Sequence, residues 1–317
     1  MKIAMLSEKQ ILDNISKQQN PFFDEYYAFY SSWYGGITTN PRMMLLPIDD
    51  HMVHRGDGVF EAVKTSNRSV YLLDEHLHRL LQSANIISLN TLLCLDDMKH
   101  IVLETLQVAN HDDVIIRIYL SRGPGDFSVN PYDSLGAQFY VVITKLHPPS
   151  NKKIQEGIAI GQSAIPIKSS WMAQVKSCNY LPNVMMKKEA VDRNLDFVIG
   201  IDSHGFIAEG PTENIMMVDK QGTILHPEFD NILKGITMTR VCELARENGL
   251  KTKVQAISVK DLRSAQEVMM TGTTLDVLPV VRFENQLIGK GQPGTITKKL
   301  RELIISDMNY GQRRSAF

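Results

Sequence analysis

The chain has 317 residues, of which 43% are hydrophobic, so it is long enough to bury the cores of two domains or of one large domain. Its 34 basic and 35 acidic side chains give a formal net charge of -1, so no excess of positive charge is present to attract a polyanion over the whole surface. We therefore expect no nucleic-acid partner.

The sequence also argues against a membrane protein and against a disulfide framework. No apolar run approaches the roughly 18 residues that a membrane-spanning helix needs. The three cysteines, Cys94, Cys178 and Cys242, are odd in number and far apart, without the spacing of a metal or redox motif. A reducing cytoplasm is the simplest compartment for such a chain.

The first part of the chain contains one clear helix pattern and one clear strand pattern. Asp74 can cap a helix, and Arg79 lies off the apolar stripe of that helix. The stripe has helical spacing and consists of Leu77, Leu80, Leu81 and Ala84. Residues 114–121 alternate in the manner of a strand, which places Arg117 and Tyr119 together on a mixed face.

A proline-containing segment separates this part from the rest. Residues 146–153 combine two prolines with polar residues between two apolar, strand-like runs, and we interpret them as an interdomain linker. The linker predicts a smaller N-terminal α+β domain, residues 1–145, and a larger C-terminal domain, residues 154–317.

Strands and turns dominate after the linker. Residues 197–201, 206–208 and 215–218 alternate with turn signals and are typical of a meander. Helices are predicted at residues 181–193, 237–248 and 295–306, and the tail Gln312–Phe317 is predicted to be a solvated, frayed end. The mixture favours an α+β fold over a doubly wound parallel sheet.

Two segments carry the chemistry of the chain. Lys176 lies within residues 175–183 (VKSCNYLPN), and Glu209 begins residues 209–214 (EGPTEN). A lysine that forms a Schiff base with pyridoxal phosphate needs an acidic residue near the pyridine nitrogen, which keeps the ring protonated and able to accept electrons. Lys176 and Glu209 are the candidate pair.

Further motifs stand around this pair in a recognisable order. They are residues 54–61 (HRGDGVFE), 76–80 (HLHRL), 121–127 (SRGPGDF), 233–237 (LKGIT) and 271–274 (TGTT). In this order the chain resembles the class IV pyridoxal-phosphate-dependent aminotransferases, over most of its length. The resemblance implies the two-domain fold of that family, and residues 47–56 (PIDDHMVHRG) are most similar to the plant-type D-amino-acid transaminases.

The resemblance implies roles for the residues around the cofactor. Lys176 holds the pyridoxal phosphate, Tyr180 donates to its phenolic oxygen, and Glu209 lies beside the ring nitrogen. The freed lysine then moves the substrate α-proton as general base and acid.

The phosphate of the cofactor needs donors. The backbone N–H groups of Ile236 and Thr237 would lie at the positive end of a predicted helix, which is a ready anion site. Arg79 can add a forked, permanently charged contact. By resemblance, Thr273 is a further phosphate contact.

The residues that bind the substrate carboxylate differ from those of the bacterial D-amino-acid transaminases. Those enzymes place an arginine and a histidine five and seven residues after the arginine of an Arg-Gly pair, where this chain has Phe127 and Val129. The candidate carboxylate holders are therefore Arg55 and Arg117. Phe60 and the backbone at Thr274 complete the predicted substrate site.

Several functions remain open from the sequence. Transamination of D-alanine and of D-glutamate or D-aspartate leads, with 2-oxo acids as the second substrates. An L-branched-chain transaminase is a rival, because Glu213 resembles the residue of the branched-chain enzymes. Aminodeoxychorismate lyase is a second rival activity. A non-catalytic carrier of pyridoxal phosphate is the alternative that is not an enzyme. The resemblance implies a homodimer, and no metal is expected at His51 and His54.

Overall fold

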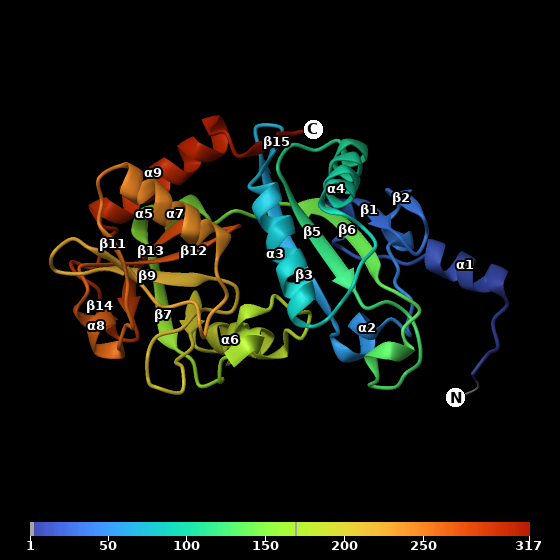
Figure 1. Cartoon of the computed structure of the whole chain (residues 1–317), viewed down its shortest axis with the longest axis horizontal. Helices are drawn as coiled ribbons and strands as arrows, with labels where there is room; N and C mark the ends of the chain where they lie inside the picture. The colour runs from blue at the N-terminus through green and yellow to red at the C-terminus, as the bar shows by residue number, and fades with distance from the viewer. Residues whose placement is uncertain (1–2, 169) are drawn as a thin grey trace.

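The computed structural model describes residues 3–168 and 170–317, and in this part of the chain the strands form two sheets (Figure 1). The strands of the first sheet are β1 Tyr26–Ser31, β2 Gly36–Thr38, β3 Gly58–Ser66, β4 Ser69–Tyr71, β5 Val114–Ser121, β6 Gln138–Lys145 and β15 Arg314–Ala316. Those of the second sheet are β7 Ile158–Gln162, β8 Phe197–Ile199, β9 Asn214–Val218, β10 Ile224–His226, β11 Thr252–Val254, β12 Glu267–Gly272, β13 Asp276–Phe283 and β14 Gln286–Leu287. The α-helices are α1 Glu8–Ser16, α2 His51–Arg55, α3 Leu73–Ile86, α4 Leu95–Ala109, α5 Asn151–Glu156, α6 Leu181–Asp192, α7 Ile236–Glu247, α8 Val259–Ser264 and α9 Thr295–Tyr310.

The two sheets differ in their topology. The first has the order β15-β4-β3-β5-β6-β1-β2, and its neighbouring strands are antiparallel. The second has the order β11-β10-β9-β12-β13-β7-β8 and is mixed, because β7 runs parallel to both β13 and β8 while β12 is antiparallel to its neighbours. Helices combined with an antiparallel and a mixed sheet confirm the predicted α+β class.

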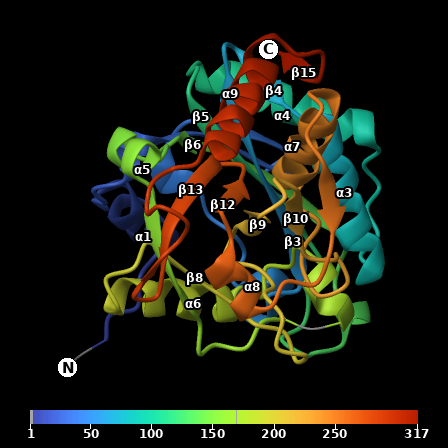
Figure 2. The same cartoon turned by 90° about the vertical axis from the view of Figure 1, so that its left-hand side faces the viewer.

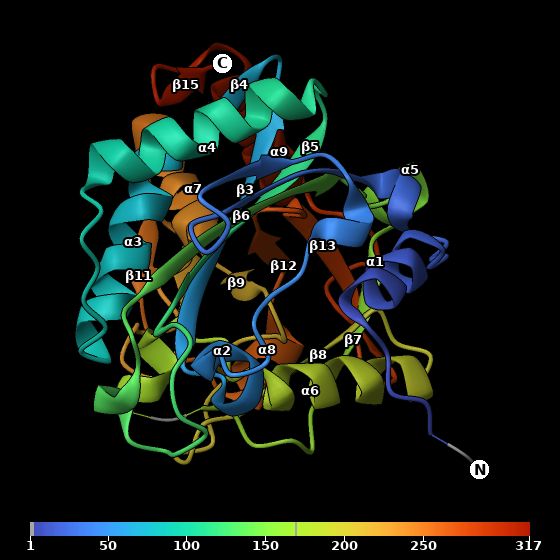
Figure 3. The same cartoon turned by 90° about the vertical axis from the view of Figure 1, so that its right-hand side faces the viewer.

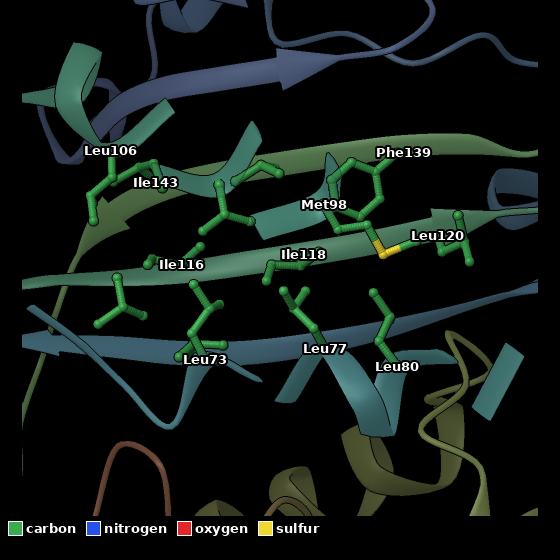
Figure 4. Close-up of a cluster of buried hydrophobic side chains, with 14 of the residues drawn as sticks. Leu73, Leu77, Leu80, Met98, Leu106, Ile116, Ile118, Leu120, Phe139 and Ile143 are labelled. Carbon is green, nitrogen blue, oxygen red and sulfur yellow. The ribbon is translucent and has the colours of Figure 1, made fainter. Parts of the chain in front are cut away.

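One face of the first sheet is covered by α3 and α4 (Figure 3). Figure 4 shows Leu77 of α3 and Met98 of α4 directed at Ile118 of β5 within a cluster that excludes water. The opposite face of β5 carries Arg117 and Tyr119, which are only partly buried. The strand alternation therefore leaves this second face free to line a site, as the sequence predicted.

The second sheet is buried on both faces. Along β9, Met216 and Val218 belong to the cluster under α7 and α9, whereas Ile215 and Met217 belong to the cluster on the other face. Figure 2 shows α7 and α9 lying over this sheet. Burial on both sides explains why the strand is continuously apolar instead of alternating.

The chain crosses from one sheet to the other more than once. It leaves the first sheet at the end of β6 and enters the second at β7, and β15 returns to pair with β4 of the first sheet. A buried ion pair also joins the sheets, because Lys64 of β3 donates to Asp276 at the start of β13. None of the helices in the described part of the chain has both the length and the apolar character needed to cross a lipid bilayer.

Two local predictions were wrong, and a third holds only in part. Asp74 does not cap α3, because the helix begins at Leu73 after Leu72 in the left-handed conformation. The meander holds in part, because Ile201 pairs with Ile207 and β9 pairs with β10, both antiparallel, but β8 lies at the edge beside β7 and not next to β9. The tail is not frayed, because β15 supplies backbone pairing and Phe317 packs against the first core.

Candidate active site

A cavity of about 430 Å³ lies between the two sheets. The residues that line it come from β3, β5, the lysine segment, the start of β9, the start of α7 and the loop after β12. They include Phe60, Arg79, Arg117, Tyr119, Lys176, Tyr180, Glu213, Asn214, Ile236, Thr237, Thr273 and Thr274. Most residues that were singled out from the sequence therefore meet in one place.

Backbone hydrogen bonds fix the segment that carries Lys176 against the first sheet. The carbonyl oxygen of Lys176 accepts from Phe60 N at 2.9 Å, and Cys178 N donates to Gly58 O at 2.8 Å. The Lys176 N–H donates to Ser83 Oγ of α3 at 3.2 Å. The lysine thus belongs to a segment that behaves as a short extra strand beside β3.

The amine of Lys176 is poised to lose its proton. Its Nζ atom lies 4.6 Å from the centroid of the Phe60 ring and 5.8 Å from that of Tyr180. Burial, followed by the nearby Arg79 cation, lowers the pKa of Lys176 to about 8. A substantial fraction of the side chain is therefore a neutral nucleophile near physiological pH.

Aromatic rings form the wall next to this amine. Tyr180 contacts Phe60 edge to face at 5.1 Å, and Phe60 stacks on Tyr119 at 5.9 Å. Burial and the negative charge of Glu209 raise the pKa of Tyr180, so its hydroxyl keeps its proton and remains a donor.

Glu209 lies behind the lysine and not in the main cavity. It lines a small adjoining cavity of about 30 Å³ together with Lys176 and Tyr180. Its Oε2 atom accepts from Leu233 N at 3.0 Å. Burial raises the pKa of Glu209 to about 7, although Leu233 N–H, Lys176 and Lys168 each favour the ionised form.

Arg79 is held by a buried carboxylate that sequence reasoning did not assign. Its Nε and Nη2 atoms donate to Glu61 of β3 at 2.6 and 2.7 Å, and Nη1 donates to Lys234 O at 2.8 Å. His76 also contacts Glu61, with Nδ1 2.7 Å from Oε2. Burial alone would raise the pKa of Glu61, but Arg79 and His76 lower it to about 2. The ion pair with Glu61 therefore fixes Arg79 in the wall of the cavity.

The start of α7 provides an anion site at the other end of the cavity. Its N-cap, Gly235, makes no side-chain cap hydrogen bond, so no side chain of the cap satisfies the N–H groups of the first turn, where Ile236 and Thr237 lie. A Cβ atom at Gly235 would lie 1.8 Å from Asn214 Oδ1, so any larger residue would have to displace the Asn214 side chain, which donates to Leu233 O. This cradle has the donors and the space that a phosphate group requires.

The two arginines predicted to hold the substrate carboxylate lie in different places. Arg117 faces the cavity, and its Nη1 donates to Thr144 Oγ1 at 2.7 Å. Arg55 does not line the cavity; its Nη2 donates to Phe127 O at 2.6 Å in an exposed contact. Within one chain, Arg117 is therefore the better placed of the two.

Glu61 and Glu213 are the residues whose positions were not predicted. Glu213 is buried, lines the cavity and accepts from Thr212 N at 2.9 Å, and burial raises its pKa. The position of Glu61 could have been inferred from the sequence, because successive residues of a strand face opposite sides. Phe60 of β3 faces the cavity, so Glu61 faces the helix that carries Arg79. In the part of the chain that is described, no group of three or more acidic, histidine or cysteine side chains is arranged to hold a metal ion.

Comparisons with known proteins identify the family. The family model described as "Amino-transferase class IV" matches residues 58–283. The chain is 39% identical over 293 residues to the D-amino-acid transaminase, chloroplastic, of Arabidopsis thaliana, an alignment that covers 90% of this chain and 78% of the relative. The chain is a class IV aminotransferase. This family depends on pyridoxal phosphate.

Other relatives carry a different substrate in their names. The branched-chain-amino-acid aminotransferase of Pseudomonas aeruginosa is 27% identical, with 85% of this chain and 90% of that protein covered. The crystal structure of Escherichia coli branched-chain amino acid aminotransferase superposes with a TM-score of 0.86 at 22% identity, covering 92% of this chain and 99% of the other. These likenesses support the fold and leave the substrate to be argued from the site.

The donor set of the cavity fits the cofactor of the family. The uncapped start of α7 and Arg79 suit a phosphate, the buried amine of Lys176 suits an aldehyde, and Tyr180 remains a hydroxyl donor. The carboxyl group of Glu209 suits a ring nitrogen. Bound pyridoxal phosphate supplies an electron sink, and the residues around it supply orientation and proton transfer.

Proposed function

We propose that the chain is a transaminase of D-amino acids, with D-alanine and D-glutamate or D-aspartate as amino donors and 2-oxo acids as acceptors. The observation that carries this proposal is Arg117, a guanidinium in the cavity wall beside Phe60 and Tyr119. Its bond to Thr144 leaves further N–H groups of the planar fork for a substrate carboxylate. The likeness to the Arabidopsis D-amino-acid transaminase supports the same substrate class.

The protein side chains would divide the work of the reaction. Lys176 would hold the cofactor, and its neutral amine would take up and give back the substrate α-proton, for which bound pyridoxal phosphate would supply the electron sink. Phe60 and Tyr180 flank this amine. Arg79, Ile236, Thr237 and Thr273 would hold the phosphate, while Arg117 and the backbone at Thr274 would orient the carboxylate.

Two rival activities share the same chemistry. An L-branched-chain transaminase is favoured by Glu213, which lines the cavity and resembles the residue of the branched-chain enzymes. Aminodeoxychorismate lyase is the second rival, because it belongs to the same family.

A panel of amino donors distinguishes these activities. The purified chain is incubated with D- and L-alanine, glutamate, aspartate, leucine and valine, with 2-oxoglutarate and pyruvate as acceptors, and the product amino acid is resolved by chirality. We expect D-alanine and D-glutamate or D-aspartate to react at least about 100-fold faster than their L-forms, a difference of about 2.7 kcal/mol in transition-state binding. Preferential use of L-valine or L-leucine as donors, with L-glutamate or L-alanine as the product, would establish the branched-chain activity instead.

Arg79 and Arg117 form a matched pair for mutation. Losing a charged, desolvated contact costs about 2 to 5 kcal/mol, which is roughly a 30-fold to several-thousand-fold effect. Arg79→Ala should weaken cofactor retention, and excess cofactor should partly restore activity. The change also leaves the buried carboxylate of Glu61 without its arginine partner, so it should lower the melting temperature.

Arg117→Ala should raise the Michaelis constant, most of all for dicarboxylic substrates, with cofactor retained. If dialysis strips cofactor from the Arg117 variant and not from the Arg79 variant, the two roles are reversed.

We also propose a homodimer, and the cytoplasm as the compartment. Light scattering of the purified chain tests the first. Three free cysteines support the second, although the Arabidopsis relative is named as chloroplastic.

A further inference from the structure

A second lysine lies close to the reactive one. Lys168 precedes the short helical turn Ser170–Gln174 and is partly buried. It lines the cavity of about 30 Å³ together with Lys176 and Glu209, but it does not line the main cavity. Its ammonium group and the carboxyl group of Glu209 therefore share a space that lies apart from the main cavity.

Aromatic rings fix the positions of both ammonium groups. Lys168 Nζ lies 5.0 Å from the centroid of the Tyr180 ring and 3.5 Å from Ser177 Oγ. Lys176 Nζ lies closest to Phe60, with Tyr180 as its second ring. Because a cation is attracted to the face of an aromatic ring, Lys168 is held at Tyr180 and not left in bulk water.

Several neighbouring charges determine whether the carboxyl group of Glu209 is ionised, and Lys168 is one of them. Burial disfavours its carboxylate, and so does the neighbouring Glu213, while the Leu233 N–H group and the two cations Lys176 and Lys168 favour it. Lys176 reacts only as a neutral amine, so one of these two cations is lost whenever the lysine does its chemistry. Lys168 takes no part in that reaction. Burial lowers its pKa, but the charge of Glu209 favours the ammonium form, and both residues line the same small cavity.

We propose that Lys168 is a positioning residue of the active site, whose ammonium group keeps Glu209 in its carboxylate form while Lys176 is uncharged. This inference rests on the proposed roles of Lys176 and Glu209. An ionised Glu209 can hold a proton on the ring nitrogen of the cofactor, whereas a neutral carboxylic acid cannot do so by charge. Removing Lys168 raises the proton affinity of Glu209, so Glu209 competes better with the ring nitrogen for the proton that they share, and a smaller fraction of the ring nitrogen is protonated near neutral pH.

Nitrogen-15 NMR of the full-length holoprotein measures this effect directly. The chain is loaded with pyridoxal phosphate labelled at the ring nitrogen, whose chemical shift reports protonation, and is titrated through neutral pH. We expect Lys168→Met and Lys168→Gln to lower the ratio of protonated to unprotonated ring nitrogen near pH 7 by about tenfold. Lys168→Arg keeps the charge and should titrate as the wild type does. Lys290→Met, which replaces an exposed lysine, is the control.

The outcomes separate the inference from the function on which it rests. Wild-type titration in either neutral variant, or a shifted titration in Lys168→Arg, overturns the role of Lys168. The use of two neutral variants of different shape keeps the test decisive if one of them fails to fold. An unprotonated ring nitrogen in the wild type, or a covalently held cofactor in Lys176→Ala, would instead contradict the proposed roles of Glu209 and Lys176.

Discussion

Lys176→Ala is expected to abolish turnover. A positioned acid or base typically contributes about 10² to 10⁴ to the rate, and this residue would also provide the covalent attachment of the cofactor, so we expect a loss on the order of 10⁴ or more. The variant should fold, because the change removes a buried amine whose charged form is disfavoured by desolvation. The absorbance of the bound cofactor and a single-turnover assay with an amino donor measure the two losses separately.

The pH dependence of cofactor uptake is a second test of Lys176. Burial lowers the pKa of Lys176 from 10.5 to about 8, so the reactive neutral amine accumulates as pH rises through 8. The rate at which the cofactor-free chain takes up pyridoxal phosphate should therefore rise with a midpoint near pH 8. Lys290→Ala should leave both the rate and the midpoint unchanged. A midpoint near 10.5, or a fully active Lys176→Ala variant, would contradict the assignment.

Residues whose environment is set by local pattern were predictable from the sequence. The alternation in β5 places Arg117 and Tyr119 on one face, and the structure has them together in the cavity wall. The helical stripe of α3 excludes Arg79, which leaves that guanidinium free to reach the site. In both cases the periodicity of a single element decides where a side chain points.

Residues whose environment depends on distant segments were not predictable in this way. Glu61 and Arg79 are 18 residues apart, and only the packing of α3 on β3 makes them partners. Lys168 approaches Tyr180 because the chain turns back between β7 and α6. The meander holds only in part for a related reason. β9 pairs with β10, the next strand in sequence, but its other neighbour is β12, which is reached across a long connection.

Glu209→Gln tests whether the charge of Glu209 is needed to keep the ring nitrogen of the cofactor protonated. Glutamine has nearly the same shape as glutamate, and its amide oxygen can still accept from Leu233 N, so the variant should fold and retain cofactor. A neutral amide cannot stabilise a protonated ring nitrogen by charge, and the bound cofactor then becomes a poorer electron sink. We expect proton abstraction from the substrate to slow by about 10² to 10⁴, in the range that a misplaced proton or charge costs an enzyme.

The sign of the pH dependence adds a further test of Glu209. Burial raises its pKa from 4.5 to about 7, so without a cation at the ring position the carboxylate forms as pH rises through 7. The neighbouring cation of a protonated ring would extend the ionised range below that value. Single-turnover rates of the wild type should therefore fall as pH drops below neutrality, and in Glu209→Gln this step should disappear while the rate stays low throughout. Because the amide preserves the shape and the Leu233 contact, equal rates in wild type and variant would make Glu209 a structural residue only.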